Sequence, residues 1–374
     1  MKVYILNYKR SPIGSFLSQF KNISINNLSN QCINSLLDDF DRKNIDKIYI
    51  GNVLSAGLGQ NIARQIGLDN NIDVPSITVN NVCGSGLLSV IEGVKSILLN
   101  ESNCVLVGGV ESMSNSPHIC NIRNNKYGNL ELIDSMQIDG LKDSFTNKTM
   151  TELSEELCYK QNITRKQYDD YAIEMYKRSR HAMNEGLFKK EITSININNK
   201  IIHNDEEIYK VEDLNKIYKL NPIYKDGIST PGNISKLSDG VAFMLLVSEK
   251  FINEHNIKPL AEIVDYDLSI CDPKEAPICV TKSIQNLIKH NIDIYEINDA
   301  FPLCSIYTHK ILNIPYNKIN LYGSSISIGH PLGCSGLRIL CTLLTILQNK
   351  QKNIGCACIA NGGGGSTSIV IKIL

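Results

Sequence analysis

The sequence predicts an α/β protein made of two similar halves, each with a sheet covered on both faces by helices. Three observations support this prediction. Apolar, strand-like runs alternate with helix-like segments along most of the chain. A Gly-Ser-Gly-Leu turn at residues 84–87 recurs in altered form as Cys-Ser-Gly-Leu at residues 334–337. Each turn precedes an apolar-periodic helix, and each helix is followed by a strand that runs into glycines.

Length and composition exclude several classes of protein. The chain has 374 residues, enough for two or three domains, and its 38 basic and 38 acidic residues give zero net charge. Without a basic stripe or an acidic tail, the sequence does not indicate a nucleic-acid or membrane partner. We find no apolar stretch of membrane-spanning length and no signal or transit peptide. The twelve irregularly spaced cysteines favour reduced thiols in the cytoplasm, and none has metal-site spacing.

The first strand–turn–helix unit surrounds Cys83. A β-prone run at residues 77–82 leads into Cys83, and an amphipathic segment follows at residues 87–98. We therefore expect the thiol at a helix N-terminus, where backbone N–H groups and the helix dipole lower its pKa and make it a nucleophile. A buried structural cysteine is the alternative. The glycines at 84 and 86 favour the nucleophile, because they let a large ligand approach the backbone.

The similarity between the two halves extends well beyond this turn. Chance resemblance of short apolar runs is the alternative, but several segments correspond in order. The corresponding pairs are helices 90–99 and 339–347, strands with following glycines 104–109 and 356–365, upstream strands 46–51 and 293–298, and final strands 241–247 and 366–373. We place the first half at residues 1–111 plus 239–250 and the second half at residues 251–374.

Residues 112–238 interrupt the first half with a polar segment. It contains a helical pattern at residues 165–186, which Thr164 begins as an N-cap with Gln167 three residues later. Several tyrosines and a phenylalanine argue against a disordered linker. We interpret this segment as an inserted loop domain that covers the mouth of the active site.

His330 occupies the matching turn of the second half, in the run Gly-His-Pro-Leu-Gly at residues 329–333. Pro331 holds His330 out of helical geometry, so the imidazole projects from a loop. If the halves pack about a pseudo-twofold axis, Cys83 and His330 converge, and a Cys–His pair is a standard way to activate a thiol. A structural histidine in a glycine-rich loop is the alternative, which the matching position in the repeat makes less favoured.

Two further motifs follow predicted strands of the second half. Asn298 ends the strand at residues 294–297, at the carboxyl edge where ligands gather in such sheets. It can hold a water or polarise a carbonyl oxygen, or it can simply form an Asx turn. The glycines at 362–365, which follow Asn361, offer backbone N–H groups to an oxyanion or form a flexible turn.

Taken together, these motifs resemble the thiolase superfamily, and within it the short-chain acetyl-CoA acetyltransferases. The resemblance covers almost the whole chain, and the order and spacing of its motifs are much more specific than any one of them. The matching segments are residues 10–16, 59–65, 81–87, 108–115, 233–235, 238–240, 298–301, 329–333 and 361–365. It implies a thiolase-like fold of two duplicated βαβαβ-type halves forming a layered αβαβα core, with an inserted loop domain.

The resemblance also implies a set of catalytic residues. Cys83 matches the acyl-accepting nucleophile, and His330 matches the residue that activates it. Asn298 matches the asparagine that positions a water, with His330, at a first oxyanion site. The backbone N–H groups of Cys83 and Gly362 match a second oxyanion site.

The same resemblance implies how substrates are held. Ser235 matches a serine that lies against the pantetheine arm, and Met150 and Phe301 match residues beside the acyl group that favour short chains. The implied substrates are acetyl-CoA, acetoacetyl-CoA and coenzyme A, with no tightly bound cofactor and no metal. The implied assembly is a homodimer or homotetramer.

One position departs from the family pattern. Where the family carries the cysteine that moves the proton on the substrate α-carbon, this chain has Ala360. A methyl group cannot take that proton, and general acid–base assistance is typically worth ~10²–10⁴-fold in rate. Cys358, two residues away on the same face of a strand, and Cys334 are the candidates to replace it.

We therefore expect an acyl-CoA acyltransferase that interconverts two acetyl-CoA with acetoacetyl-CoA and coenzyme A through an acyl-enzyme on Cys83. Ala360 is expected to slow the carbon–carbon step more than the acyl transfer. Two alternatives stay open. One is a thioesterase or decarboxylating condensing enzyme that uses Cys83, His330 and Asn298 alone. The other is a non-catalytic acyl-CoA-binding protein with the same fold.

Overall fold

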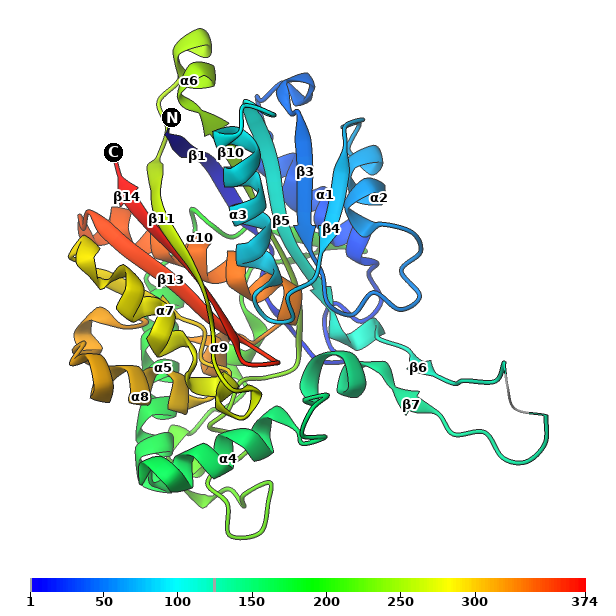
Figure 1. Ribbon diagram of the computed structural model, residues 1–374, viewed down its shortest axis with the longest axis vertical. Coiled ribbons are helices and arrows are strands. Elements are labelled where there is room, and N and C mark those ends of the chain that lie inside the picture. Colours follow the sequence, from blue (N-terminus) through cyan, green and yellow to red (C-terminus); the bar gives the residue numbers. More distant parts are fainter. Residues whose placement is uncertain (1, 124–125) are drawn as a thin grey trace.

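One large sheet runs through the protein, a computed structural model that describes residues 2–123 and 126–374 (Figure 1). Its strand order is β12-β13-β14-β11-β1-β10-β5-β3-β4, with the short strand β2 (Gly14–Ser15) paired to β10. The strands of the first half are β1 (Val3–Arg10), β3 (Lys47–Gly51), β4 (Ser76–Val79), β5 (Cys104–Ser112) and β10 (Ser238–Ser248). Those of the second half are β11 (Ala261–Ile270), β12 (Ile294–Ile297), β13 (Ile354–Asn361) and β14 (Gly365–Ile373).

The two halves repeat the same strand arrangement. In the first, β3 is parallel to β5, and β10 is antiparallel to both β5 and β1. In the second, β12 is parallel to β13, and β14 is antiparallel to both β13 and β11. The strands of the two halves join into one hydrogen-bonded sheet, because β1 and β11 pair over three residues, from Val3↔Ile263 to Ile5↔Ala261. This pairing satisfies backbone groups that two open edges would leave exposed.

A pair of aspartates shows the duplication in atomic detail. Asp46, just before β3, accepts hydrogen bonds on Oδ2 from two consecutive N–H groups at the start of β5, at 2.6 and 3.0 Å. Asp293, just before β12, accepts on Oδ2 from two consecutive N–H groups at the start of β13, both at 3.1 Å. Each half thus fixes the register of its parallel strand pair with the same carboxylate.

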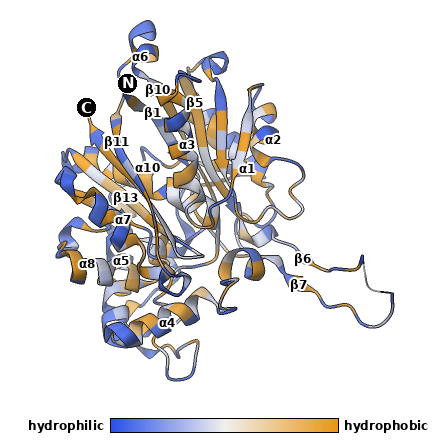
Figure 2. Cartoon of the chain, viewed as in Figure 1, coloured by the Kyte–Doolittle hydropathy of each residue, from blue (hydrophilic) through white to orange (hydrophobic). Residues whose placement is uncertain are grey.

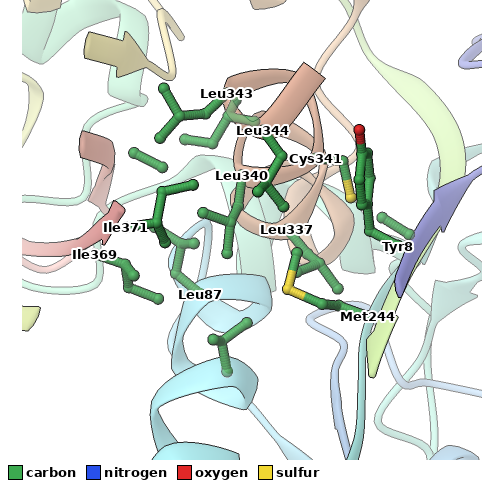
Figure 3. Close-up of a cluster of buried hydrophobic side chains, with 14 of the residues drawn as sticks. Tyr8, Leu87, Met244, Leu337, Leu340, Cys341, Leu343, Leu344, Ile369 and Ile371 are labelled. Carbon is green, nitrogen blue, oxygen red and sulfur yellow. The ribbon is translucent and has the colours of Figure 1, made fainter. Parts of the chain in front are cut away.

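Helices add three layers to the sheet. Helices α1 (Ile25–Leu36) and α2 (Ile62–Asp69) pack on the outer face of the first half, and α7 (Val280–Leu287) and α8 (Pro302–Leu312) on that of the second. Between the halves lie α3 (Ser85–Leu98) and α10 (Leu332–Lys350), whose apolar faces form the central core (Figure 3). The predicted αβαβα layering is therefore confirmed.

Helices α3 and α10 cross at a pair of glycines. A Cβ atom on Gly86 would lie 2.7 Å from the backbone nitrogen of Leu337, and one on Gly336 would lie 2.6 Å from that of Leu87. Because neither position tolerates a side chain, the two helix N-terminal regions meet in direct backbone contact. This close crossing brings the residues that precede both helices to the same place.

Among the described residues, α10 is the helix long and apolar enough to cross a membrane by length and composition, yet 89% of its apolar window is buried inside the protein. Figure 2 shows it passing through the interior between the strands. We therefore interpret α10 as a core helix.

The two remaining short helices are α6 (Glu249–His255) and α9 (Ser325–Ile328).

The described residues of the segment, 112–123 and 126–238, are largely irregular and include the two long helices α4 and α5. The helix predicted after Thr164 is confirmed as α5 (Arg165–Asn184), with a full capping box between Thr164 and Gln167, and it ends two residues before the predicted limit. Helix α4 precedes it, and the strands β6 and β7 belong to an arm that projects from the body (Figure 1). The bounds are α4 (Met150–Gln161), β6 (His118–Ile119), β7 (Ile133–Asp134), β8 (Ile195–Ile197) and β9 (Lys200–Ile202). Our placement of domain boundaries at 112 and 238 stays a prediction.

Candidate active site

A cavity of about 270 Å³ lies where the starts of α3 and α10 meet the inserted segment. Residues of both halves and of the segment 112–238 line it. Seven of the residues singled out from the sequence are in its wall: Cys83, His330, Gly362, Ser235, Met150, Phe301 and Ala360.

Cys83 lies on a strained turn between β4 and α3. Asn80 accepts a hydrogen bond on Oδ1 from the Val82 N–H at 3.0 Å, which starts the turn. Val82 then adopts a φ of +48°, an unusual conformation for a β-branched residue, and Gly84 is the N-cap of α3. Such outliers cost ~1–3 kcal/mol and cluster at functional sites. The residue that follows this strained position is Cys83, which lines the cavity.

The second half holds this turn in place. Asn361 donates through Nδ2 to Asn81 Oδ1 at 3.3 Å, and Asn81 donates to Thr367 Oγ1 at 3.3 Å. A Cβ on Gly84 would lie 2.6 Å from Asn361 Oδ1, so glycine is required for this docking. The contact sets Gly362 beside Cys83, and its backbone N–H faces the Cys83 sulfur.

The expected low pKa of Cys83 is wrong. The N–H groups of Cys83 and Gly362 do favour the thiolate, but burial disfavours it more, and the nearby Glu111 carboxylate adds to that effect. Together they raise the pKa of Cys83 to about 12. The sulfur therefore rests as a thiol and becomes a nucleophile only when a base takes its proton.

His330 supplies such a base. The backbone N–H of His330 donates to Lys236 O at 2.9 Å, and the imidazole Nδ1 lies 2.6 Å from Ser335 Oγ. Ser335 donates its own proton to Pro331 O at 2.8 Å, so it must accept from Nδ1–H. The lone pair is then on Nε2, which is buried without a hydrogen-bond partner in the described residues. Burial, with the Arg338 charge, lowers the pKa of His330 to about 3, so the imidazole rests neutral.

Helix α10 begins earlier than the sequence predicted. The residues 334–337 were expected to precede the helix, but they lie inside it, because Pro331 is the N-cap and α10 begins at Leu332. The buried carboxylate of Glu111 accepts from the Gly333 N–H at 2.8 Å and so satisfies a helix-start donor from the other half. Burial raises the pKa of Glu111 to about 7.

Asn298 lies behind His330, outside the cavity wall. Its Nδ2 is 3.5 Å from His330 Nδ1, too long for a strong bond and aimed at a nitrogen that already donates to Ser335. The amide is oriented from the far side, where Ser325 donates to Asn298 Oδ1 at 2.6 Å and Arg338 donates to Ser325 at 2.9 Å. The expectation that Asn298 positions a water stays a prediction.

The two thiols expected to replace the missing family cysteine are misplaced. Ala360 is in the cavity wall, but Cys358 and Cys334 are fully buried and outside it. Cys358 packs into the core on the outer side of β13 and contacts the carbonyl of Glu296 at 3.7 Å, while Cys334 packs between α10 and the sheet. Cys304, which the sequence did not single out, is in the wall instead. No pattern in the sequence indicates it, because its position depends on how α8 packs against α7 and the 3₁₀ helix Pro273–Ile278.

The cavity thus combines a thiol, a neutral imidazole with a free lone pair, and backbone N–H groups at one place. This set can form and release a covalent acyl group on sulfur. A larger hollow of about 710 Å³ between α5 and α8 is lined by none of these residues. Within residues 2–123 and 126–374, no cluster of three His, Cys, Asp or Glu side chains is placed to hold a metal ion.

Comparison with known proteins finds family models and relatives that match almost the whole chain. The family model "Thiolase, N-terminal domain" matches residues 3–250, and "Thiolase, C-terminal domain" matches residues 257–373. An acetyl-CoA acetyltransferase of Candida albicans is 35% identical over 99% of this chain and 97% of its own length. A cytosolic acetyl-CoA acetyltransferase of Gibberella zeae is 39% identical over 100% of this chain and 98% of its own.

Solved structures of thiolases have the same fold as this chain. The Acat5 thiolase of Ascaris suum, in complex with coenzyme A, superposes with a TM-score of 0.95 at 33% identity over 100% of both chains. The human mitochondrial 3-ketoacyl-CoA thiolase, in complex with CoA, superposes with a TM-score of 0.96 at 30% identity over 100% of this chain and 98% of that one.

Proposed function

The chain belongs to the thiolase family, and from that premise we propose that it transfers an acetyl group between coenzyme A thioesters through an acyl-enzyme on Cys83. One observation supports this most directly. Cys83, the unpartnered Nε2 of His330 and Gly362 meet in one cavity, although they come from opposite halves of the chain.

The resting protonation states define the first step. Because Cys83 and His330 are both neutral, Cys83 attacks the thioester carbonyl as its proton moves to His330 Nε2. The negative charge that develops on the carbonyl oxygen is stabilised by backbone N–H groups, among which those of Cys83 and Gly362 are the proposed donors. The coenzyme A sulfur then leaves with the proton from His330, and acetyl-Cys83 remains for a second acceptor.

The second acceptor determines the overall reaction. When it is the α-carbon of another acetyl-CoA, the product is acetoacetyl-CoA, and the reverse reaction is thiolysis by coenzyme A. Both directions need a group that moves a proton on that carbon. Ala360 brings no such group to its place in the wall, so we expect acyl transfer to be faster than the carbon–carbon step.

The acyl-enzyme is tested by intact-protein mass spectrometry after brief exposure to acetyl-CoA. We expect one acetyl adduct on wild type, located at Cys83 by peptide mapping, and none on Cys83→Ala. Cys32→Ala, which removes a buried thiol outside the cavity wall, is the matched control and should acetylate normally. Binding of coenzyme A without any adduct would instead favour a non-catalytic binding protein. Steady release of free acetate would favour a thioesterase.

The contribution of residue 360 is tested by Ala360→Cys. The new thiol would be at a position that lines the cavity. We expect acetoacetyl-CoA thiolysis to rise at least tenfold, a smaller gain than the ~10²–10⁴-fold that general acid–base assistance typically supplies. An unchanged rate would show that the missing cysteine does not limit the reaction.

We also propose that the protein works as a homodimer or homotetramer. Two exposed apolar features support this: the edge strand β4, where Ile77 is exposed, and the projecting arm around β6 and β7 (Figure 2). The exposed apolar residues of the arm are Ile119, Ile122, Leu130, Leu132 and Ile133. Light scattering coupled to gel filtration should give a multiple of the 41.7 kDa chain mass.

A cytoplasmic location is the remaining proposal. All twelve cysteines are free thiols, a state that fits a reducing compartment, and the relative from Gibberella zeae is described as cytosolic. Subcellular fractionation should recover the protein with cytosolic markers. Recovery in an organelle fraction would refute the proposal.

A further inference from the structure

We propose that Cys304 is the residue that exchanges the α-carbon proton in the carbon–carbon step. This inference rests on the proposed function. It is supported by the composition of the cavity wall, where Cys304 and Cys83 are the two thiols.

Cys304 reaches the cavity from the first turn of α8. Phe301 is the N-cap of this helix and Pro302 its first residue, so the sulfur-bearing residue is the third. Its N–H donates to Phe301 O at 3.1 Å, and its carbonyl accepts from Thr308 Oγ at 2.7 Å. Cys304 is 1% exposed, so its place in the wall is fixed by the surrounding packing.

Besides Cys83 and His330, the wall contains Cys304, Lys236 and Tyr224 as proton-bearing titratable side chains. Lys236 Nζ donates to Ile234 O at 2.5 Å, and the Tyr224 hydroxyl is hydrogen-bonded to Thr149 at 2.8 Å. Ala360 packs against the same buried cluster that includes Cys304, which places the two residues on the same side of the site. The wall also contains Ala276, Pro277, Ala300 and Phe301, none of which has a side-chain proton to exchange. Among the proton-bearing side chains of the wall, Cys304 is the one that shares its buried cluster with Ala360.

Polar atoms in the same cavity indicate that a ligand binds there. His330 Nε2 and Asn361 Oδ1 are buried, and neither has a hydrogen-bond partner among the described residues. Both residues line the cavity together with Cys304. Because unsatisfied buried polar atoms are costly, they point to a polar substrate group as their partner. Cys304 therefore lines the same cavity that we assign to the bound thioester.

The environment of the sulfur suits a proton donor. Burial and the nearby Asp299 carboxylate raise the pKa of Cys304, so it rests as a thiol. The backbone N–H groups at the start of α8 face the sulfur and favour the thiolate that forms once the proton has left. The thiol can therefore give up its proton to a strongly basic carbanion and later recover it.

The thiolysis cycle balances with these two thiols. Cys83 attacks the C3 carbonyl of acetoacetyl-CoA as its proton moves to His330; the C2–C3 bond then breaks, and its electron pair goes to C2. Cys304 gives its proton to C2, and acetyl-CoA leaves. Coenzyme A then gives its thiol proton to the Cys304 thiolate and attacks acetyl-Cys83. The Cys83 sulfur departs with the proton held by His330, which restores the resting site.

The experiment separates acylation from the carbon–carbon step. Wild type, Cys304→Ala and Cys304→Ser are compared for acetyl-Cys83 formation, acetoacetyl-CoA thiolysis, and incorporation of deuterium from D₂O into the acetyl methyl group of acetyl-CoA. We expect both variants to form acetyl-Cys83, while thiolysis and deuterium incorporation fall at least a hundredfold, in the lower part of the ~10²–10⁴ range of acid–base assistance. Failure of wild type to form acetyl-Cys83 would refute the proposed function itself, which is a different result.

Two further variants make the test specific. Cys358→Ala removes a buried thiol on the same strand face as Ala360 but outside the wall, and it should leave both activities unchanged. Adding Ala360→Cys to Cys304→Ala should restore thiolysis, because the new thiol takes over the proton. Thiolysis by Cys304→Ala within threefold of wild type would overturn the inference. A parallel loss of acetyl-Cys83 in both Cys304 variants would also overturn it, because Cys304 would then be structural.

Discussion

The two halves of the chain place their reactive residues by the same backbone device. Cys83 and His330 each directly precede the N-cap of a central helix, and each follows a residue with positive φ. In the first half that residue is Val82, at +48°, and in the second it is Gly329, at +118°. The comparison shows that duplication provides the geometry, while the chemistry and the local strain have diverged. One half supplies the atom that forms the bond, and the other supplies the base.

The largest effect should come from removing the base. His330→Ala leaves Cys83 with no nearby acceptor for its proton, so single-turnover acetylation should slow by ~10²–10⁴-fold. Quenched-flow mass spectrometry measures this rate, and His181→Ala, on the exposed face of α5, is the matched control. If acetylation stayed within threefold of wild type, the second half would not supply the base.

The next effect concerns the protonation states of Cys83 and His330 before substrate binds. Because the pKa of Cys83 is raised to about 12, its thiolate fraction should grow tenfold for each pH unit below that value. Alkylation of Cys83 by iodoacetamide should therefore accelerate ~10³-fold between pH 6 and 9, as followed by peptide mass spectrometry. A rate that is flat over this range would indicate a Cys–His ion pair instead of two neutral partners.

The symmetry of the helix crossing is tested by adding one methyl group to each half. Gly86→Ala and Gly336→Ala place a Cβ 2.7 and 2.6 Å from backbone nitrogens of the facing helix. Each should lower the free energy of unfolding by roughly 1–3 kcal/mol or more, and by similar amounts. Urea unfolding provides the measurement, with Lys160→Ala on the exposed face of α4 expected to change it by less than about 0.5 kcal/mol. Strongly unequal losses would show that the crossing is not symmetric.

The smallest effect concerns strain in the first half. Val82→Gly removes a conformational cost of ~1–3 kcal/mol but adds unfolded-chain entropy worth roughly 0.5–1 kcal/mol. We therefore expect the free energy of unfolding to rise by about 1 kcal/mol, while acetylation slows several-fold because Cys83 is held less firmly. Gly329→Ala should instead lower the free energy of unfolding, since its Cβ would lie 2.4 Å from Ser238 Oγ. A loss of stability in Val82→Gly would show that the turn is not strained.

Local patterns predicted much of this molecule from the sequence. The capping box at Thr164 and Gln167 and the strand–turn–helix unit around Cys83 depend on neighbours within a few residues, so they could be read directly. The matching positions of Cys83 and His330 followed from the repeat. The family resemblance then implied the order of the layers.

The features that the sequence did not predict depend on packing between distant segments. The pKa of Cys83 was expected to fall because helix-start N–H groups are visible in the sequence, whereas the burial that outweighs them is not. Cys304 enters the cavity wall through the packing of α8 against α7 and the 3₁₀ helix Pro273–Ile278, and Glu111 reaches the start of α10 across the boundary between the halves. Such contacts join residues far apart in the chain, with no local signal at either partner.

The position of β10 between β1 and β5 has a consequence for biosynthesis. β5 ends at Ser112 and β10 ends at Ser248, so the first half lacks an internal strand until the ribosome has added the whole of residues 113–248. At roughly 5–20 residues per second, the nascent chain carries unpaired strand edges for on the order of ten seconds. Chaperone capture during translation should therefore be concentrated in this interval and end once β10 has left the exit tunnel.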